Sequence, residues 1–320
     1  MSMSSRIILL MLVVFSGITT QSWATAYDLP DENDALIGEV QIVYSKYEDT
    51  LLDIARRHDI GYEEIVAVNP GVNVWLPGAG TRIVLPTQYI LPPVPRKGIV
   101  INIPEMRLYY YPETKDNSRA QVITYPISIG RLNWSTPLVV TTITKKTIDP
   151  VWIPPESIRE EYEKAGNPLP GVISAGPDNP LGKYALALGI PGYLIHGTNR
   201  AYGIGLQSTH GCIRLYPEDI EALFNSVRVG AQVRIINQPY KSGWSNGMLY
   251  LEAHSRFDAD QDSSNDSFTP AIRKIVAEVP ETLSQEVDWE TVRATLLRSN
   301  GIPIPVTTTQ SADLKVPAEK

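Results

Sequence analysis

Apolar and polar residues recur along the chain with the spacing of strands and with the spacing of helices. Both spacings occur in a short unit at residues 41–86. Residues 41–44 and 81–85 have the apolar, β-branched character of strands. Between them, apolar residues at helical spacing predict two short helices, and we expect Asp49 to cap the first. The second should end at Asn69, because proline follows it and disfavours helix at the residue before. The order β-α-α-β predicts a small α+β domain.

Strand patterns dominate the next region, residues 98–237. The predicted strands are residues 98–103, 106–111, 121–129, 138–147, 184–188, 192–195 and 232–236. One helix interrupts them: Pro217 stands at its start, and apolar residues follow at positions 220, 223, 224 and 227. The sequence therefore predicts a mostly β protein.

The N-terminus has the pattern of a cleaved signal peptide over residues 1–26. Arg6 precedes a continuous apolar run from Ile7 to Phe15, which is too short to span a bilayer. Ser22-Trp23-Ala24 and Ala24-Thr25-Ala26 both fit a cleavage site. We expect cleavage near Ala26 and an exported protein with no membrane span after cleavage.

The C-terminal part carries weaker patterns. Residues 240–304 are expected to hold a strand at 248–253 and short helices at 270–279 and 287–299, without an evident role. Residues 305–320 are polar and are expected to be a disordered tail.

Composition narrows the classes of function. The 320 residues suffice for about two domains, and 43% hydrophobic content is ordinary for a globular protein. The formal net charge of −7 argues against a nucleic-acid partner. The only cysteine, Cys212, excludes an internal disulfide, and a free thiol is unusual in an exported protein.

The candidate chemistry lies around that cysteine. His196 follows a predicted strand, while His210 and Cys212 flank Gly211 in a loop before the predicted helix. A thiol has an ordinary pKa near 8.5, so an imidazole that takes its proton turns it into a nucleophile. The backbone N–H groups of Gly211 and Cys212 could hold a developing oxyanion, and Arg214 could favour the thiolate or bind a substrate carboxylate.

This pattern resembles the catalytic signature of the L,D-transpeptidases, the YkuD domain. The resemblance rests on His196-Gly197-Thr198, a ten-residue gap and Thr209-His210-Gly211-Cys212-Ile213-Arg214. It implies a β-sandwich-like catalytic domain at 98–237. It also implies Cys212 as nucleophile, His196 as proton donor and acceptor, and the Gly197 carbonyl as the group that orients His196. His210 would be supporting, and Arg214 and Thr209 would lie in the substrate pocket.

Residues 41–86 resemble a LysM module, a small fold that binds glycans such as peptidoglycan. The matching residues are Tyr44, Asp49-Thr50-Leu51, Ile54-Ala55, Asn69-Pro70, Gly80 and Ile83-Leu85-Pro86. Glu48 departs from the family, which usually has glycine there.

The two resemblances together imply a periplasmic enzyme of cell-wall biogenesis that acts on peptidoglycan stem peptides and glycan strands, without a cofactor. Cys212 would attack the carbonyl of meso-diaminopimelate in a tetrapeptide stem and expel D-alanine. The acyl group would pass to another stem, giving a 3–3 cross-link, or to a lysine of an outer-membrane lipoprotein. The residues alone leave open a hydrolase using the same thiol, a zinc amidase with His196, His210 and Cys212 as ligands, and a non-catalytic wall-binding protein.

Overall fold

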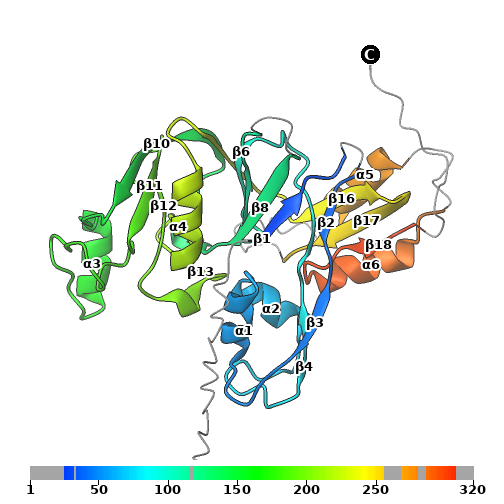
Figure 1. Cartoon of the computed structure of the whole chain (residues 1–320), viewed down its shortest axis with the longest axis horizontal. Coiled ribbons are helices and arrows are strands. Elements are labelled where there is room, and N and C mark those ends of the chain that lie inside the picture. The colour runs from blue at the N-terminus through cyan, green and yellow to red at the C-terminus, as the bar shows by residue number, and fades with distance from the viewer. Residues whose placement is uncertain (1–24, 32–33, 115–118, 256–267, 280–285, 308–320) are drawn as a thin grey trace, which may run out of the picture.

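The computed structural model describes residues 25–31, 34–114, 119–255, 268–279 and 286–307 (Figure 1). Residues 1–24 of the expected signal peptide and residues 308–320 of the expected tail lie outside these ranges. Within the described ranges, every helix is too short or too polar to cross a membrane.

One nine-stranded sheet forms the centre of the molecule. Its strand order is β1-β8-β7-β6-β15-β10-β11-β12-β14, and two neighbouring pairs, β15–β6 and β12–β14, are parallel while the others are antiparallel. In chain order its strands are β1 (Thr25–Asp28), β6 (Gly98–Asn102), β7 (Arg107–Tyr111), β8 (Gln121–Pro126), β10 (Val139–Ile148), β11 (Tyr184–Leu188), β12 (Leu194–His196), β14 (Ile213–Arg214) and β15 (Gln232–Ile236). The predicted mostly β class is confirmed.

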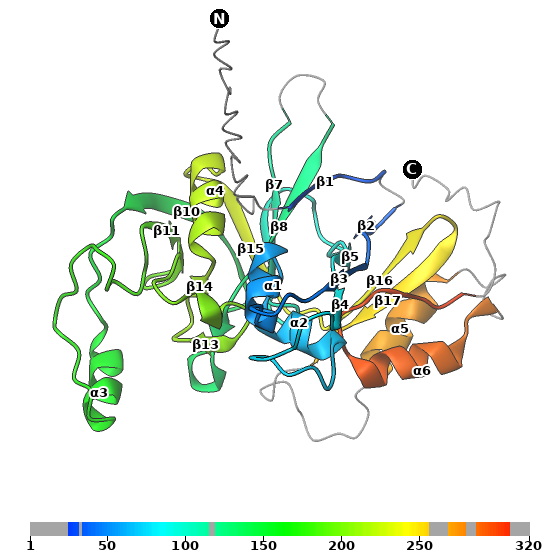
Figure 2. The same ribbon diagram turned by 60° about the horizontal axis from the view of Figure 1, so that its bottom comes forward.

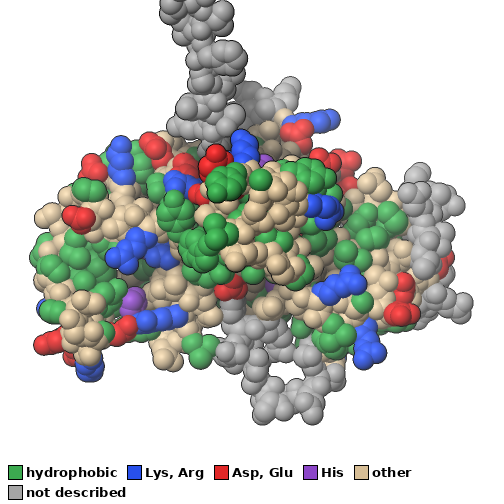
Figure 3. Space-filling view, turned by 90° about the horizontal axis from the view of Figure 1, so that it is seen from below, with side chains coloured by type: hydrophobic (Ala, Val, Ile, Leu, Met, Phe, Trp, Pro, Cys, Tyr) green, Lys and Arg blue, Asp and Glu red, His purple; other side chains and the backbone are tan. Residues whose placement is uncertain are grey.

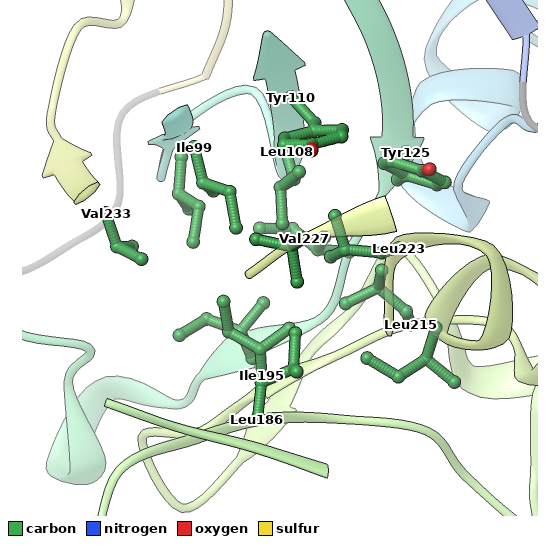
Figure 4. Close-up of a cluster of buried hydrophobic side chains, with 14 of the residues drawn as sticks. Ile99, Leu108, Tyr110, Tyr125, Leu186, Ile195, Leu215, Leu223, Val227 and Val233 are labelled. Atoms are coloured by element: carbon green, nitrogen blue, oxygen red, sulfur yellow. The ribbon is translucent and has the colours of Figure 1, made fainter. Parts of the chain in front are cut away.

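The sheet curves over a single apolar core. Figure 4 shows Ile99 and Leu108, from β6 and β7, facing Leu186 and Ile195, from β11 and β12, across this core. Helix α4 (Pro217–Ser226) closes it with the stripe that the sequence predicts, beginning at Pro217. Two ends of one sheet therefore enclose the core as the two layers of a sandwich do.

The unit at residues 41–86 has the predicted order of elements. Strands β3 (Gln41–Tyr44) and β4 (Arg82–Leu85) pair antiparallel, and helices α1 (Leu51–Arg57) and α2 (Tyr62–Val68) lie between them in the chain. Apolar residues of both helices and of β4 form its core. Below, we call residues 41–86 the βααβ unit.

The cap of helix α1 differs from the prediction. Thr50, not Asp49, is the N-cap: its Oγ1 accepts the Asp53 N–H at 3.0 Å, and Asp53 Oδ2 accepts the Thr50 N–H at 3.0 Å. Asp49 instead accepts from Arg57 at 2.7 Å, so its carboxylate is used across the helix. This reciprocal bonding satisfies two N–H groups that a helix start leaves unpaired.

A buried ion pair fastens the βααβ unit to the central sheet. Arg107 of β7 is fully buried, and its Nη2 lies 2.8 Å from Oε1 of Glu64 in α2. The same guanidinium donates to the Asp59 carbonyl at 3.0 Å and lies over the ring of Tyr89. Tyr89 belongs to β5 (Gln88–Ile90), which pairs with β2 (Leu36–Gly38) beside the unit. The unit is therefore held as part of one body with the sheet.

The described residues between 240 and 307 form a third unit with its own core. Strands β16 (Tyr240–Ser245), β17 (Met248–Ala253) and β18 (Ile304–Pro305) pack against helices α5 (Thr269–Glu278) and α6 (Trp289–Arg298). The strand and both helices predicted there are confirmed. The predicted start of the tail at 305 is wrong, because Val306 is fully buried in this core and Thr307 Oγ1 accepts the Leu249 N–H.

Lys241 joins this third unit to the sheet. Its ammonium is fully buried, 2.9 Å from Glu105 and 2.8 Å from Glu252, and it donates to the Ile90 carbonyl at 2.7 Å. Glu105 follows β6 in the turn to β7, so the contact spans two units. His254 Nε2 lies 2.6 Å from the same Glu252. Among the described residues, Glu105, Glu252 and His254 are the one group of three or more His, Cys, Asp or Glu residues whose potential metal-ligand atoms lie close together. The ammonium of Lys241 compensates the negative charge of the two carboxylates in this group.

Candidate active site

Strands β12 and β14 bring the two halves of the sequence motif together. They pair in parallel, with Ile195 opposite Ile213 and His196 opposite Arg214. Because side chains alternate along a strand, His196 and Arg214 project from the same face of the sheet. Cys212 comes directly before β14, and its Sγ lies 3.6 Å from the Gly192 carbonyl just before β12. The thiol and both side chains are therefore carried by neighbouring strand ends.

The ring of His196 is buried and has a fixed tautomer. Its Nδ1 lies 2.7 Å from the Gly197 carbonyl, which can only accept, so Nδ1 carries the proton and Nε2 is left as an acceptor. Burial, helped by the Arg214 charge, lowers the pKa of His196 to about 4, against the opposing effects of hydrogen bonds to the backbone of Gly197 and Leu181. The imidazole is therefore neutral at pH 7 and can take up a proton at Nε2.

The Cys212 side chain is partly exposed and is a thiol at rest. Its burial raises the pKa of the Cys212 thiol, and the Leu194 N–H lowers it only in part. Among the contacts of the described residues, none joins Sγ to the His196 ring. A preformed thiolate–imidazolium pair is thus not the resting state, and proton transfer must accompany attack on a substrate.

The loop before Cys212 is held by buried hydroxyls, that of Thr136, which donates to the Gly211 carbonyl at 2.9 Å, and that of Thr209. Thr209 ends β13 (Gln207–Thr209), which pairs with β9 (Ile129–Gly130). Its Oγ1 donates to the Cys212 carbonyl at 2.6 Å and accepts the Gly211 N–H at 3.2 Å. Thr209 therefore positions the loop, and its predicted place in the substrate pocket stays a prediction. The Gly211 N–H can meet an oxyanion only after its bond to Thr209 opens.

Gly211 occupies a position that only glycine fits. Its φ is +99°, and a Cβ there would lie 2.9 Å from the ring of Tyr193. Both the backbone conformation and the neighbouring ring exclude a side chain. The glycine lets the chain turn sharply into Cys212.

The side chain of His210 contacts Arg131, Glu161 and Trp134, and no contact among the described residues joins it to the Cys212 thiol. Arg131 Nη2 lies 2.8 Å from His210 Nε2, and the carboxylate of Glu161, which also pairs with Arg131, lies 3.3 Å from it. Trp134 packs against the ring edge-to-face. Burial and the Arg131 charge lower the pKa of His210. The structure thus gives His210 a role in fixing the segment around it.

Helix α3 (Glu156–Lys164), which carries Glu161, lies in the long connection between β10 and β11 (Figure 2). The sequence pattern predicted neither this helix nor its contact to His210. Only Ile158 of its residues is buried, so it has no apolar stripe for the sequence to reveal.

The three ligands of the zinc alternative do not converge. Nδ1 of His196 is committed to Gly197, and Nε2 of His210 to Arg131. Across the described ranges, the only group of three or more such residues with ligand atoms within 4.8 Å of one another is the Glu105 group that surrounds Lys241. The donor set of a zinc amidase is therefore absent from the described part of this site.

A basic cleft adjoins the site on the Arg214 side. The cleft has a volume of about 800 Å³, and three arginines line it: Arg56, Arg200 and Arg214. Arg214 Nη2 donates to Ser208 Oγ at 2.7 Å and to the Gly203 carbonyl at 3.2 Å, and its Nε has no partner among the described residues. Burial and the Arg200 charge lower the pKa of Arg214. The cleft suits a ligand that carries carboxylates.

A thiol and an oriented, neutral imidazole on neighbouring strand ends, near an arginine-lined cleft, are groups that a cysteine acyl-transfer enzyme would use. Residues 96–235 match the model of the L,D-transpeptidase catalytic domain, YkuD.

The chain is 40% identical over 295 residues to the probable L,D-transpeptidase ErfK/SrfK of Escherichia coli, covering 89% of this chain and 92% of that protein. It is 42% identical to the probable L,D-transpeptidase YbiS of the same organism, over 75% of this chain and 78% of the relative. The identity to YcfS, also a probable L,D-transpeptidase of Escherichia coli, is 43% over 72% and 73%. The chain belongs to the L,D-transpeptidase family.

Proposed function

We propose that the protein is a peptidoglycan L,D-transpeptidase that uses Cys212 as nucleophile. The observation that carries the proposal is the His196 tautomer: a buried Gly197 carbonyl fixes the proton on Nδ1, and Nε2 remains as a base on the strand beside the thiol. Membership of the family supplies the reaction, and the site supplies the groups that the reaction needs.

The first step forms a thioester. Cys212 Sγ attacks the carbonyl of meso-diaminopimelate in a tetrapeptide stem, while its proton passes to His196 Nε2. The Cys212 N–H holds the oxyanion, joined by the Gly211 N–H once that group leaves Thr209. The tetrahedral intermediate then collapses, the C–N bond to D-alanine breaks, and His196 returns the proton to the departing amine.

The second step transfers the acyl group. An amine attacks the thioester and loses a proton to His196, the C–S bond breaks, and the Cys212 thiol is restored. The acceptor amine belongs either to another stem peptide, giving a 3–3 cross-link, or to a lysine of an outer-membrane lipoprotein. We assign recognition of the stem carboxylates to Arg214 and Arg200 at the cleft, because a guanidinium binds a carboxylate with paired hydrogen bonds.

The βααβ unit is proposed to act as a LysM-like module that holds a glycan strand. Exposed apolar side chains gather over this unit at the centre of Figure 3. They include Tyr44, Tyr47, Trp75 and Leu76, which are between 62% and 84% exposed. Aromatic faces of this kind pack against sugar rings, and their exposure in a folded domain favours a ligand there. Residues 1–26 are proposed to be a signal peptide that directs export to the periplasm, where the wall lies.

A defined substrate tests the reaction. Mature protein is incubated with a disaccharide tetrapeptide, and the products are separated and weighed by mass spectrometry. We expect loss of D-alanine and a dimer joined through diaminopimelate, and neither product with Cys212→Ala. A tripeptide without dimer, even when amine is in excess, would indicate the hydrolase. Unchanged tetrapeptide together with binding to intact sacculi would indicate the non-catalytic wall-binding protein.

A further inference from the structure

Helix α1 of the βααβ unit contributes a cation to the arginine-lined cleft. Arg56, in the last turn of α1, lines the same cleft as Arg200 and Arg214. Its side chain is 40% exposed, so the guanidinium is accessible to a ligand in the cleft. Arg214 lies two residues after Cys212 and opposite His196 in the paired strands. A unit that lies far from the catalytic motif in the chain therefore forms part of the wall of the cleft.

Backbone contacts fix the βααβ unit against that wall. The Tyr62 N–H, at the start of α2, donates to the Ile204 carbonyl at 3.0 Å. The Glu63 N–H donates to the Gly205 carbonyl at 3.2 Å. Gly205 has a φ of +84°, and a Cβ there would lie 2.5 Å from the Cα of Gly61, so the two segments meet backbone to backbone. The neighbouring cleft-lining loop is therefore held at a fixed place relative to the unit.

The carboxylate of Glu218 orients the guanidinium of Arg56. Nε of Arg56 donates to Oε1 of Glu218 at 2.8 Å, and Nη2 donates to Oε2 at 2.9 Å. The same guanidinium lies over the ring of Tyr216, 5.6 Å from its centroid. A guanidinium has five N–H donors, and this pair uses two of them along one edge. Arg56 thus keeps donors for another acceptor on a side chain that is already held in place, which reduces the entropy that binding would cost.

The substrate of the proposed reaction supplies such acceptors. A peptidoglycan tetrapeptide stem has free carboxylates on its glutamyl, diaminopimelyl and D-alanyl residues. A cleft of about 800 Å³ is in the size range that holds a ligand as large as this peptide. Three guanidinium groups around one cleft therefore match a ligand with several carboxylates better than a ligand with one.

We propose that Arg56 of the βααβ unit is a substrate-binding residue, and that it binds a carboxylate of the donor stem peptide beside Arg200 and Arg214. This inference rests on the proposed transpeptidase function and extends it to the binding of the donor. The unit that is proposed to hold the glycan strand then also holds part of the stem that the strand carries. Because the unit is fixed to the cleft wall, it would present strand and stem to Cys212 in one orientation.

Steady-state kinetics of D-alanine release test the role of Arg56 in the mature chain. Arg56→Gln should raise KM for the tetrapeptide about tenfold and change kcat little, because a charge-assisted bond is lost from bound substrate and transition state alike. The matched control is Arg57→Gln: the next residue of α1 pairs with Asp49 at 2.7 Å and is not among the described residues that line the cleft. Its KM should stay within about twofold of the parent. Equal KM values for parent and Arg56→Gln would overturn the proposal.

A second pair of variants separates substrate binding from a purely structural ion pair. Glu218→Gln also breaks the charge pair, but it keeps the cation in the cleft and an oxygen that accepts from Arg56. We expect its KM not to rise, whereas Arg56→Lys, which keeps the charge without the fork of donors, should give a KM between those of the parent and Arg56→Gln. If Arg56 only braces α1 against α4, Glu218→Gln and Arg56→Gln should raise KM alike. That result would overturn the proposal.

Binding without turnover separates this inference from the proposed reaction. Titration calorimetry with the Cys212→Ser chain gives the Kd of the tetrapeptide and of three analogues, each with one carboxylate converted to a carboxamide. We expect one carboxamide to weaken binding about tenfold when Arg56 is present and to have little effect in Arg56→Gln, which identifies the carboxylate that Arg56 binds.

The outcomes for binding and for the reaction are distinct. Binding that depends on Arg56, in a chain whose parent releases no D-alanine, would contradict the proposed function and support the binding role of Arg56. A stem that does not bind, or carboxamides that weaken binding equally with and without Arg56, would overturn the inference even if the parent releases D-alanine.

Discussion

The pH dependence of Cys212 acylation follows from the environment of His196. The imidazole must be neutral to take the thiol proton, and its burial holds its pKa at about 4. A base with that pKa is about 90% neutral at pH 5, whereas an ordinary histidine with pKa 6.5 is about 3% neutral there. Because the pKa of the Cys212 thiol is raised, ionisation of this thiol does not change the acylation rate near neutral pH. We therefore expect the acylation rate to stay nearly constant from pH 5 to pH 8.

The buried imidazole of His196 also makes the unfolding free energy depend on pH. The folded-state pKa of His196 is lowered from 6.5, so the unfolded chain binds more protons between the two values, and stability is lost as pH falls through that window. A shift of this size corresponds to about 3 kcal/mol of unfolding free energy between pH 6.5 and pH 4. The variant His196→Gln should lack this part of the slope.

Stopped-flow or quenched mass measurement of a β-lactam reacting with Cys212 gives the rate at each pH. Denaturant unfolding of the parent and of His196→Gln gives the stability difference. A rate that falls tenfold or more between pH 7 and pH 5.5, or a low thiol pKa in the profile, would contradict the neutral thiol–imidazole resting state. Identical pH–stability slopes for parent and variant would contradict the buried, neutral histidine.

Three further changes test other parts of the structure. Arg107→Met should lower the unfolding free energy by about 3–5 kcal/mol in denaturant titrations, because it leaves the Glu64 carboxylate buried without its partner. The exposed ion pair between Arg119 and Asp28 is the control, and Arg119→Gln should change the unfolding free energy by less than about 1 kcal/mol. Gly211→Ala should slow acylation of the thiol at least about 10-fold, since φ is +99° there, while titration in denaturant still finds one thiol. Trp75→Ser should weaken binding to purified sacculi several-fold and leave D-alanine release from a soluble tetrapeptide unchanged; parallel loss of both activities would show that the βααβ unit does more than hold glycan.

The elements that sequence predicts best are those whose side chains decide their structure. Strand β11, at 184–188, and strand β15, at 232–236, occur at the predicted residues, because most of their apolar residues are buried. Helix α4 begins at Pro217 as expected, since proline is favoured in the first turn. In each case burial and local backbone preference point to the same answer.

Elements held by other forces could not be predicted. Strand β1 is mostly exposed and belongs to the sheet only through backbone pairing with β8, about 100 residues away in the chain. The buried Lys241 depends on carboxylates at positions 105 and 252, and no local pattern distinguishes it from a surface lysine. The role of residues 240–304 in supporting the sheet therefore became visible only in the structure.

The residues of the candidate site could be predicted from the sequence, but the hydrogen bonds between them could not. The motif identifies Cys212 and His196, and the parallel pairing of β12 with β14 places them on neighbouring strand ends. Sequence could not indicate that Thr209 would bond within the loop, or that His210 would turn toward Arg131. Those outcomes depend on backbone positions fixed by strands far apart in the chain.

The most direct test of the central claim is the intact mass of the mature protein after exposure to a carbapenem, a class known to acylate enzymes of this family. Peptide mapping then locates any adduct. The account predicts one adduct on Cys212, its absence in Cys212→Ser, and a strong slowing in His196→Gln. Folded protein that remains unmodified at Cys212, or that reacts equally fast without His196, would contradict the proposed thiol mechanism.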